Sequence, residues 1–187
     1  MSVLFIDAAF REGSRTKQLA EHYLKRFGNN VERVDLGSVN LQPLNGTRLS
    51  VYNKAVERHD FSDAMFDAAK QFCAADEIVI AAPFWNYTLP AVLHDYLELV
   101  CTQGISFDMG MDGQYHTLCK AGKLTFIITA GGPIPEQNHA IGYIASLCKV
   151  FWQIEDFSCY KLDCLDLPDT DVETAVGEIV ALMDSEA

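Results

Sequence analysis

The stretch EIVIAAPFWNYTLP, residues 77–90, joins an apolar run to a group of large aromatic side chains. Residues 77–83 show little alternation of polar and apolar positions, which predicts a strand buried on both faces, as in a parallel sheet. Pro83 ends this strand, so we expect Phe84, Trp85 and Tyr87 at its carboxyl end. An alternative interpretation is that these rings only cover the top of the core, because aromatic side chains are common core material.

The rest of the chain alternates strands and helices around this run. Further strands are predicted at residues 3–7, 31–36, 123–132 and 154–165. Helical spacing of apolar residues predicts one helix that ends before Gly28 and others at residues 63–75, with Ser62 as cap, 90–100, 138–152 and 171–184. This alternation predicts an α/β fold with a parallel sheet and right-handed crossovers.

Two segments lack a clear periodic pattern. The sequence of residues 37–61, with Pro43, Gly46 and several polar residues, predicts an irregular segment that contains one or two helical turns within residues 52–61. The glycine-rich residues 103–122 begin like a calcium-binding loop at Asp108 but have Cys119 where such a loop needs glutamate, so we predict a flexible acidic loop. The aspartates between residues 163 and 171 are interpreted as a solvated approach to the last helix.

Length and composition narrow the class of protein. A chain of 187 residues predicts a single domain, residues 1–187. A formal net charge of -12 argues against nucleic acid and anionic membranes as partners. The six cysteines form no C-x-x-C pair, which indicates reduced thiols in a cytoplasmic protein and no metal site. No apolar run approaches the roughly 20 residues of a membrane-spanning helix.

Ligands of open parallel sheets bind beyond the carboxyl ends of the strands, where the strand order reverses. The loops at residues 8–16, 83–90 and 129–136 would meet there. The last of them contains Gly131 and Gly132, which let the backbone approach a ligand closely or simply form a tight turn.

The first of these loops suits a phosphate dianion. It combines a helix start with the side chains of Arg11, Ser14, Arg15 and Thr16. An equally good interpretation of Ser14 or Thr16 is an ordinary helix cap. Taken together, the three loops predict a site for a mononucleotide with a planar ring.

The segment PFWNYTLPAVLHDYLELVCTQGISF, residues 83–107, resembles a motif of the flavodoxin-like FMN-dependent NAD(P)H quinone reductases and NADH azoreductases. That family has a Pro-aromatic-x-Asn-aromatic-x-x-Pro segment, followed by a helix and a short Gly-to-Phe sequence. The resemblance covers nearly the whole chain and is weakest at residues 37–61. It implies a flavodoxin-like three-layer sandwich, whose five-stranded parallel sheet has the order 2-1-3-4-5 with helices on both faces.

The resemblance also implies a cofactor and the residues that hold it. FMN is the expected bound cofactor, and NADH or NADPH the expected electron donor. The first loop would bind the FMN phosphate, the aromatic loop would cradle the isoalloxazine ring, and the third loop would run along its pyrimidine side. The expected FMN-binding residues are Arg11, Ser14, Arg15, Thr16, Pro83, Phe84, Trp85, Asn86, Tyr87, Thr129, Ala130, Gly131 and Gly132. The family forms homodimers, so Phe107 is expected to wall a substrate pocket with Trp85 across the interface.

Some positions depart from the family pattern. Ala8 or Ala9 stands where azoreductases often have a serine, so one phosphate hydroxyl is missing. Gln137 and Tyr143 occupy the positions of a Tyr and a His that settle charge on the reduced flavin in some quinone reductases. His139 lies nearby, but a lone histidine is more often a polar surface residue.

The expected function is an FMN-dependent NAD(P)H oxidoreductase. It would pass two electrons by ping-pong hydride transfer to quinones, azo compounds or similar small-molecule acceptors. The flavin carries this chemistry, so no catalytic side chain is expected. One alternative is a flavodoxin-type electron carrier without NAD(P)H turnover, and another is a cofactor-free interaction domain of the same fold.

Overall fold

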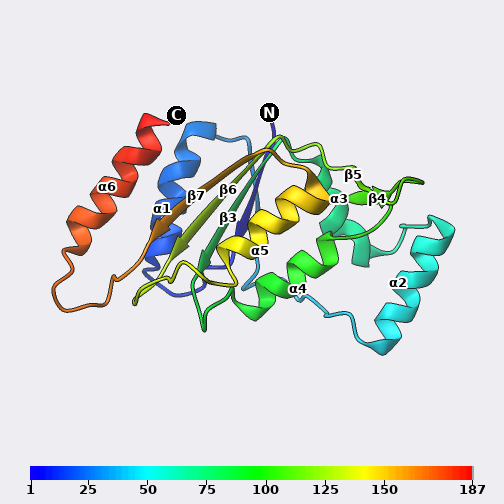
Figure 1. The fold of residues 1–187 in the computed structure, drawn as a ribbon, viewed down its shortest axis with the longest axis horizontal. Coiled ribbons are helices and arrows are strands. Elements are labelled where there is room, and N and C mark those ends of the chain that lie inside the picture. The colour runs from blue at the N-terminus through cyan, green and yellow to red at the C-terminus, as the bar shows by residue number, and fades with distance from the viewer. Residues whose placement is uncertain (187) are drawn as a thin grey trace.

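The computed structural model describes residues 1–186, in which a five-stranded sheet lies between two layers of helices (Figure 1). The order of the strands is β2-β1-β3-β6-β7, and all neighbouring pairs are parallel. Counted along the chain, this is the predicted order 2-1-3-4-5, which is confirmed. The strands are β1 (Val3–Asp7), β2 (Val31–Asp35), β3 (Glu77–Pro83), β6 (Lys123–Thr129) and β7 (Asp156–Leu162).

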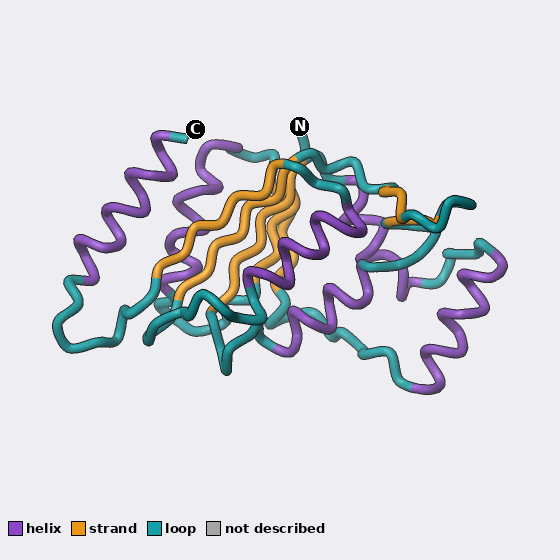
Figure 2. Tube along the Cα trace, in the orientation of Figure 1, coloured by secondary structure: helices purple, strands orange, loops and turns teal. Residues whose placement is uncertain are grey.

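Helices cover both faces of the sheet (Figure 2). One face carries α1 (Arg15–Leu24) and α6 (Val172–Ser185), and the other carries α3 (Asp67–Ala74), α4 (Ala91–Val100) and α5 (Ile141–Leu147). Successive side chains of each strand point to opposite faces of the sheet and pack against the two helix layers in turn. In β1, Val3 and Phe5 pack with α1, whereas Leu4 and Ile6 pack in the cluster with α3 and α4. The predicted three-layer α/β sandwich is therefore confirmed.

The helix α2 (Gly46–Arg58) confirms the helical turns expected after residue 52 but begins earlier, so the prediction of an irregular segment was wrong for residues 46–51. Asn45 begins this helix by accepting a hydrogen bond from the Arg48 amide at 3.2 Å, and His59 ends it in the left-handed conformation. None of its residues is buried, and it extends away from the sheet (Figure 1). Its packed stripe is short: Tyr52, Ala55 and Val56 are half-buried, and the Tyr52 ring lies 5.8 Å from that of Phe66. So short a stripe gives only a weak periodic signal in the sequence.

The predicted flexible loop at residues 103–122 is instead an antiparallel hairpin of β4 (Phe107–Met109) and β5 (Tyr115–Thr117). The rings of Phe107 and Tyr115 contact Phe151, with centroid distances of 4.5 and 4.8 Å. Phe151 lies in a π-helical turn, η3 (Cys148–Trp152), which continues α5. The helix predicted at residues 138–152 therefore has two parts and starts later.

Other boundaries differ from the predictions by a few residues. A 3₁₀ turn, η1 (Lys25–Phe27), follows α1 and ends at Gly28 as predicted. The helix predicted after Ser62 begins with another 3₁₀ turn, η2 (Ala64–Phe66). Its cap is Asp63 rather than Ser62, since the Asp63 carboxylate accepts the Met65 amide at 2.8 Å.

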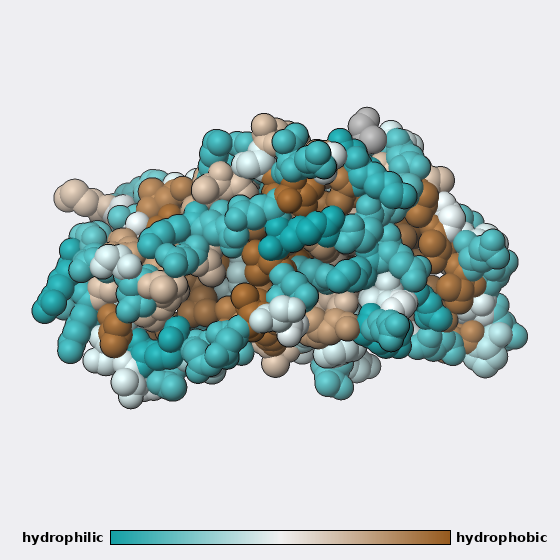
Figure 3. Space-filling model, turned by 180° about the vertical axis from the view of Figure 1, so that it is seen from behind, coloured by the Kyte–Doolittle hydropathy of each residue, from teal (hydrophilic) through white to brown (hydrophobic). Residues whose placement is uncertain are grey.

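Hydrophilic residues predominate on the face seen in Figure 3, and hydrophobic residues show mainly in the hollows between them. Within residues 1–186, no helix combines the length and the apolar character that crossing a bilayer requires.

Glu77 is a carboxylic acid inside the core, at the amino end of β3, and only 6 % of it is exposed. Its Oε1 accepts a hydrogen bond from the Tyr23 hydroxyl at 3.1 Å, and that hydroxyl lies 2.8 Å from Thr125 Oγ1. Burial raises the pKa of the Glu77 carboxyl, and the bond from Tyr23 opposes this shift only in part.

We predict that Glu77→Gln stabilises the fold relative to the wild type increasingly as the pH rises. Because the folded-state pKa is raised above the unfolded value, the stability that Glu77 contributes is present below the unfolded pKa and is lost as the pH rises through the folded pKa. Glutamine has no such dependence. Urea denaturation at pH 4 and at pH 8 measures the difference in unfolding free energy between the variant and the wild type at each pH. An equal difference at both pH values would contradict the prediction.

Candidate functional site

The loops after β1, β3, β6 and β7 gather at the carboxyl edge of the sheet, the lower edge in Figure 1, and enclose a cleft of about 260 Å³. The three loops predicted from the sequence therefore meet in space, and a fourth joins them. The lining residues are Ala9, Phe10, Arg11, Ser14, Arg15, Thr16, Pro83, Phe84, Trp85, Thr129, Ala130, Gly131, Leu165 and Asp166.

The start of α1 forms one end of the cleft. Ser14 Oγ accepts a hydrogen bond from the Lys17 amide at 3.3 Å, so this side chain acts as a helix cap. Within residues 1–186, the amides of Arg15 and Thr16 donate to no protein acceptor. Free amides at a helix N-terminus, together with the helix dipole, favour an anion at this end.

Thr16 lies in the floor of the cleft rather than at its mouth. Its Oγ1 is 2.6 Å from Thr129 Oγ1, and both residues are buried. This hydrogen bond ties α1 to the end of β6. The hydroxyl of Thr16 is therefore already paired inside the protein.

Asp7 anchors the first loop from below. Its Oδ1 accepts the Ala9 amide at 2.9 Å, and its Oδ2 lies 2.7 Å from Lys17 Nζ. The hydrogen bond to Asp7 raises the pKa of Lys17. These contacts hold the loop backbone, and both Ala8 and Ala9 are buried.

The PFWNY segment forms a tight two-residue hairpin. Trp85 and Thr88 exchange both backbone hydrogen bonds, at 3.0 and 2.9 Å. Asn86 and Tyr87 between them have φ values of 50° and 66°, as a type I′ turn requires. Glycine is usual at the second position, so Tyr87 holds a strained conformation.

The rings of this hairpin point largely into solvent. Trp85 is 48 % and Tyr87 63 % exposed, so the interpretation that they cover the core is wrong for these two rings. Only Phe84 packs partly against the core. Asn86 and Tyr87 themselves do not line the cleft.

The hairpin backbone leaves two amides for a ligand. The Phe84 amide donates to the Thr129 carbonyl at 2.8 Å, and the Trp85 amide is used by the turn. Among residues 1–186, the amides of Asn86 and Tyr87 have no protein acceptor. The Tyr87 carbonyl accepts the His139 amide at 3.0 Å, which fixes the tip of the hairpin.

Sequence reasoning missed Phe10, Leu165 and Asp166 among the cleft residues, and Asp166 is the charged one. Its Oδ1 lies 2.8 Å from Arg15 Nη1, and its amide donates to the Gly131 carbonyl at 2.9 Å. A Cβ at position 131 would meet the Asp166 carboxylate, so a larger residue there would displace this exposed side chain from its present position. The loop after the last strand ends at the same edge as the other three, a signal that could have identified Asp166.

The interpretation of these aspartates as a solvated approach to the last helix holds for Asp166, Asp169 and Asp171, which are exposed, but not for Asp163, which is half-buried. Three of them also have specific partners. Asp166 pairs with Arg15, and Asp163 Oδ2 accepts the Ile134 amide at 2.7 Å. Asp171 caps α6 by accepting the Thr174 amide at 3.1 Å.

Four further predicted or considered residues lie outside the cleft lining. Gly132 is exposed, and Phe107 lies in the β4–β5 hairpin. The side chain of His139 is exposed, and the Tyr143 ring packs at a centroid distance of 5.2 Å from that of His94 on α4. Within one chain, these side chains do not join the residues of the cleft.

Comparison with known proteins agrees with this architecture. A family model described as flavodoxin-like fold matches residues 1–173. The chain belongs to this flavodoxin-like family. An FMN-dependent NADH:quinone oxidoreductase of Coprothermobacter proteolyticus is 28% identical over 177 residues, which are 89% of this chain and 87% of that protein. FMN-dependent NADH:quinone oxidoreductase 2 of Clostridium acetobutylicum is 30% identical over 184 residues, 91% of this chain and 90% of that protein.

Solved structures show the same flavodoxin-like fold. An azoreductase from Bacillus anthracis has a TM-score of 0.86 at 23% identity and covers 100% of this chain and 98% of its own. An FMN-dependent NADH-azoreductase from the same species, in complex with FMN, has a TM-score of 0.81 at 21% identity and covers 100% of both chains.

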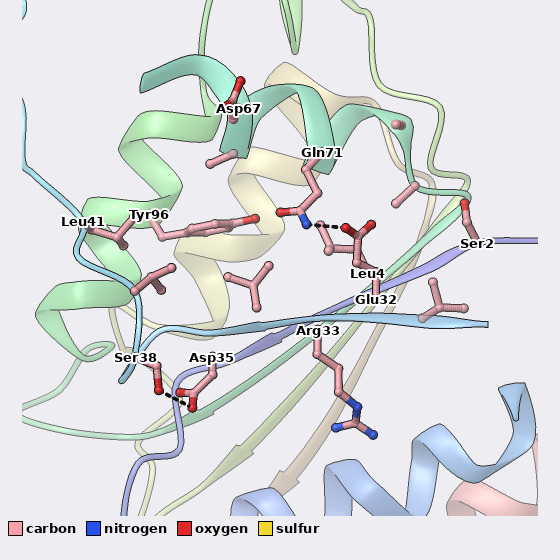
Figure 4. A pocket seen from close by; sticks show the side chains of 16 residues that line it. Ser2, Leu4, Glu32, Arg33, Asp35, Ser38, Leu41, Asp67, Gln71 and Tyr96 are labelled. Atoms are coloured by element: carbon pink, nitrogen blue, oxygen red, sulfur yellow. Dashed lines mark hydrogen bonds between the residues drawn. The ribbon is translucent and has the colours of Figure 1, made fainter. Parts of the chain in front are cut away.

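This flavodoxin-like chain has a larger groove of about 790 Å³ beside β2, which shares no lining residue with the cleft (Figure 4). Tyr96 and Leu4 point into it, and Glu32 hydrogen-bonds Gln71 at 2.7 Å. The Arg33 side chain turns away, toward Glu21 on α1. The acidic edge and the lack of an inward-facing cation among the lining residues make this groove unsuitable for a phosphate.

Metal binding has no support in the described part of the chain. Residues 1–186 contain no group of three or more His, Cys, Asp and Glu side chains placed to hold a metal ion.

We predict that Tyr87→Gly is more stable than Tyr87→Ala by about 1 kcal/mol, because only glycine relieves the positive φ. Both variants remove the same exposed ring. The matched pair Trp85→Gly and Trp85→Ala should show the opposite order, since Trp85 has no positive φ. Urea denaturation measures all four, and the same order at both positions would contradict a left-handed Tyr87.

Proposed function

We propose that this chain is an FMN-dependent NAD(P)H oxidoreductase that passes two electrons to quinones, azo compounds or similar small acceptors. The observation that carries the proposal is the layout of one cleft: anion-binding helix amides at one end and the exposed ring of Trp85 at the other. It lies where the strand order reverses, the usual ligand site of this topology. The printed names of the relatives, FMN-dependent NADH:quinone oxidoreductases, support the same function.

The residues present suit each part of FMN. The phosphate dianion would be held by the amides that begin α1 and by the guanidinium groups of Arg11 and Arg15. The ring would lie against Phe84 and Trp85, with the backbone of Ala130 and Gly131 alongside. Thr16 and Thr129 support the floor of the cleft. Gly132 and Asn86 are neighbours of lining residues in sequence but do not line the cleft themselves.

When bound, FMN supplies two-electron transfer from NADH or NADPH to the acceptor. The chain's own part is binding and orientation. The exposed rings of Trp85 and Tyr87 offer flat apolar faces for a nicotinamide or an acceptor. The free amides of Asn86 and Tyr87 can donate to a ligand carbonyl. The cleft lining contains no histidine, cysteine or tyrosine, so we assign no catalytic side chain.

The proposal predicts that purified protein takes up FMN and then oxidises NADH or NADPH with menadione as the acceptor. Absorption in the flavin bands after gel filtration measures uptake, and loss of absorbance at the nicotinamide band measures turnover. Protein that stays colourless with excess FMN would favour the cofactor-free interaction domain. Protein that holds FMN but oxidises neither nucleotide would favour the electron carrier.

Two variants test the phosphate end within the same experiment. Arg15→Ala should weaken FMN binding roughly 10- to 100-fold, because it removes a charged hydrogen-bond donor. Asp166→Asn should tighten binding, because it removes a carboxylate 2.8 Å from that guanidinium. Asp169→Asn is the matched control, since it makes the same charge change at an exposed position of the same loop. If Asp166→Asn and Asp169→Asn change the FMN affinity equally, Asp166 acts only through the net charge of the protein and not through its contact with Arg15.

We also propose a cytoplasmic homodimer. Six free cysteines support the location. A groove of about 460 Å³ between α4 and α5, lined among others by His94, Tyr143 and Phe151, supports the dimer. The helix α2 also supports the dimer, because it buries no residue within its own chain. In such a dimer, Phe107 would wall the partner's substrate pocket beside Trp85.

The dimer predicts a sedimenting mass of twice 20.8 kDa at micromolar concentration. Phe107→Arg should shift the protein toward the monomer, because it buries a charge in the interface. The control Leu182→Arg places the same charge at an exposed position of α6, on the opposite face of the sheet, and should leave the mass unchanged. A monomeric wild type, or equal effects of both substitutions, would contradict this interface.

A further inference from the structure

Cys73 and Cys119 lie side by side outside the cleft, although 46 residues separate them in sequence, and their Sγ atoms are 3.4 Å apart. Cys73 belongs to the last turn of α3, and Cys119 to the segment between β5 and β6. Both side chains are partly exposed, so a small oxidant can reach them.

The backbone already holds the two cysteines together. The Lys120 amide donates to the Cys73 carbonyl at 3.0 Å. The Cys119 amide donates to Thr117 Oγ1 at 3.0 Å, and the Leu118 amide donates to the Ser106 carbonyl at 3.0 Å. A disulfide has a sulfur–sulfur bond of about 2.05 Å, so the side chains need to close a gap of only about 1.4 Å.

We propose that Cys73 and Cys119 are an oxidative modification site, at which a hydroperoxide such as hydrogen peroxide produces a reversible intramolecular disulfide. In the first step the Cys119 sulfur attacks one peroxide oxygen, the O–O bond breaks, and a sulfenic acid and water form. In the second step the Cys73 sulfur attacks the Cys119 sulfur, the S–O bond breaks, and a second water leaves with the Cys73 proton. Two thiols thus lose two electrons, which reduce one peroxide to two waters.

The surroundings assign the first step to Cys119. Its hydrogen bond with Cys73, and after it that with Thr117, lowers the pKa of Cys119, whose sulfur also lies 3.4 Å from the Ser106 carbonyl. The contact with Cys119 and burial raise the pKa of Cys73, and its place in the last turn of α3 also disfavours a thiolate. Because the thiolate is the nucleophile, Cys119 reacts first and Cys73 resolves the sulfenic acid.

The other cysteines provide internal controls. Burial raises the pKa of Cys101, Cys148 and Cys159 to about 12 each. Within residues 1–186, Cys73 and Cys119 are the only two whose sulfur atoms are in contact. Cys164 is partly exposed as well, but within residues 1–186 its sulfur contacts no other sulfur, so a disulfide is expected only at Cys73 and Cys119.

The experiment oxidises the full-length reduced protein with hydrogen peroxide, blocks the remaining thiols with N-ethylmaleimide and maps the peptides by mass spectrometry. We expect a Cys73–Cys119 peptide pair that is two hydrogen masses lighter than the reduced peptides together and that dithiothreitol separates. The disulfide closes a long loop, so the oxidised protein should also melt roughly 5–10 °C higher.

Three variants test the order of the steps. Cys73→Ser should leave Cys119 as a sulfenic acid that dimedone traps, and Cys119→Ser should leave Cys73 reduced. Cys101→Ser should form the disulfide as the wild type does. Absence of the linked pair in the wild type, or oxidation spread over the buried cysteines, would overturn the proposal, and the wild-type map decides even if a serine variant fails to fold. None of these readouts depends on FMN binding or on NAD(P)H oxidation.

Discussion

The burial of β3 on both faces is the constraint on which the rest of the structure depends. Its backbone pairs with β1 and β6 along its length, and its side chains enter both hydrophobic clusters. A polar side chain within such a strand is buried and paired, as Glu77 is, so groups that contact a ligand lie beyond its ends. The last ladder contact, from the Phe84 amide to the Thr129 carbonyl, therefore fixes where the aromatic hairpin leaves the sheet and which loops it meets.

The cleft at this edge brings two arginines together in a protein whose formal net charge is -12. Helix amides and two arginines face it, and the carboxylate of Asp166 balances part of their charge. The ion pair of Asp7 with Lys17 and the buried hydrogen bond between Thr16 and Thr129 hold the first loop and the floor in place. Rigid support of this kind lets a few free amides and exposed rings define a binding site without a catalytic side chain.

Strain and exposure mark the same hairpin. An ordinary type I′ turn has Asn-Gly, whereas this one has Asn86 and Tyr87, and the second ring stays 63 % exposed. The protein keeps a costly conformation and an uncovered aromatic side chain at the mouth of its cleft. Such a cost is consistent with a ligand-binding role and is difficult to explain by folding alone.

Local patterns of residues were enough to predict the strands β1, β3 and β6 and the helix α4, because burial demands continuous apolar runs or helical spacing. The family motif at residues 83–107 extended this to the strand order and to most of the cleft. Three features became evident only in the tertiary structure: the helix α2, the contact of Asp166 with Arg15, and the pairing of Cys73 with Cys119. The helix α2 buries no residue. The two contacts join groups far apart along the chain, and no local pattern of residues records which distant groups will approach one another.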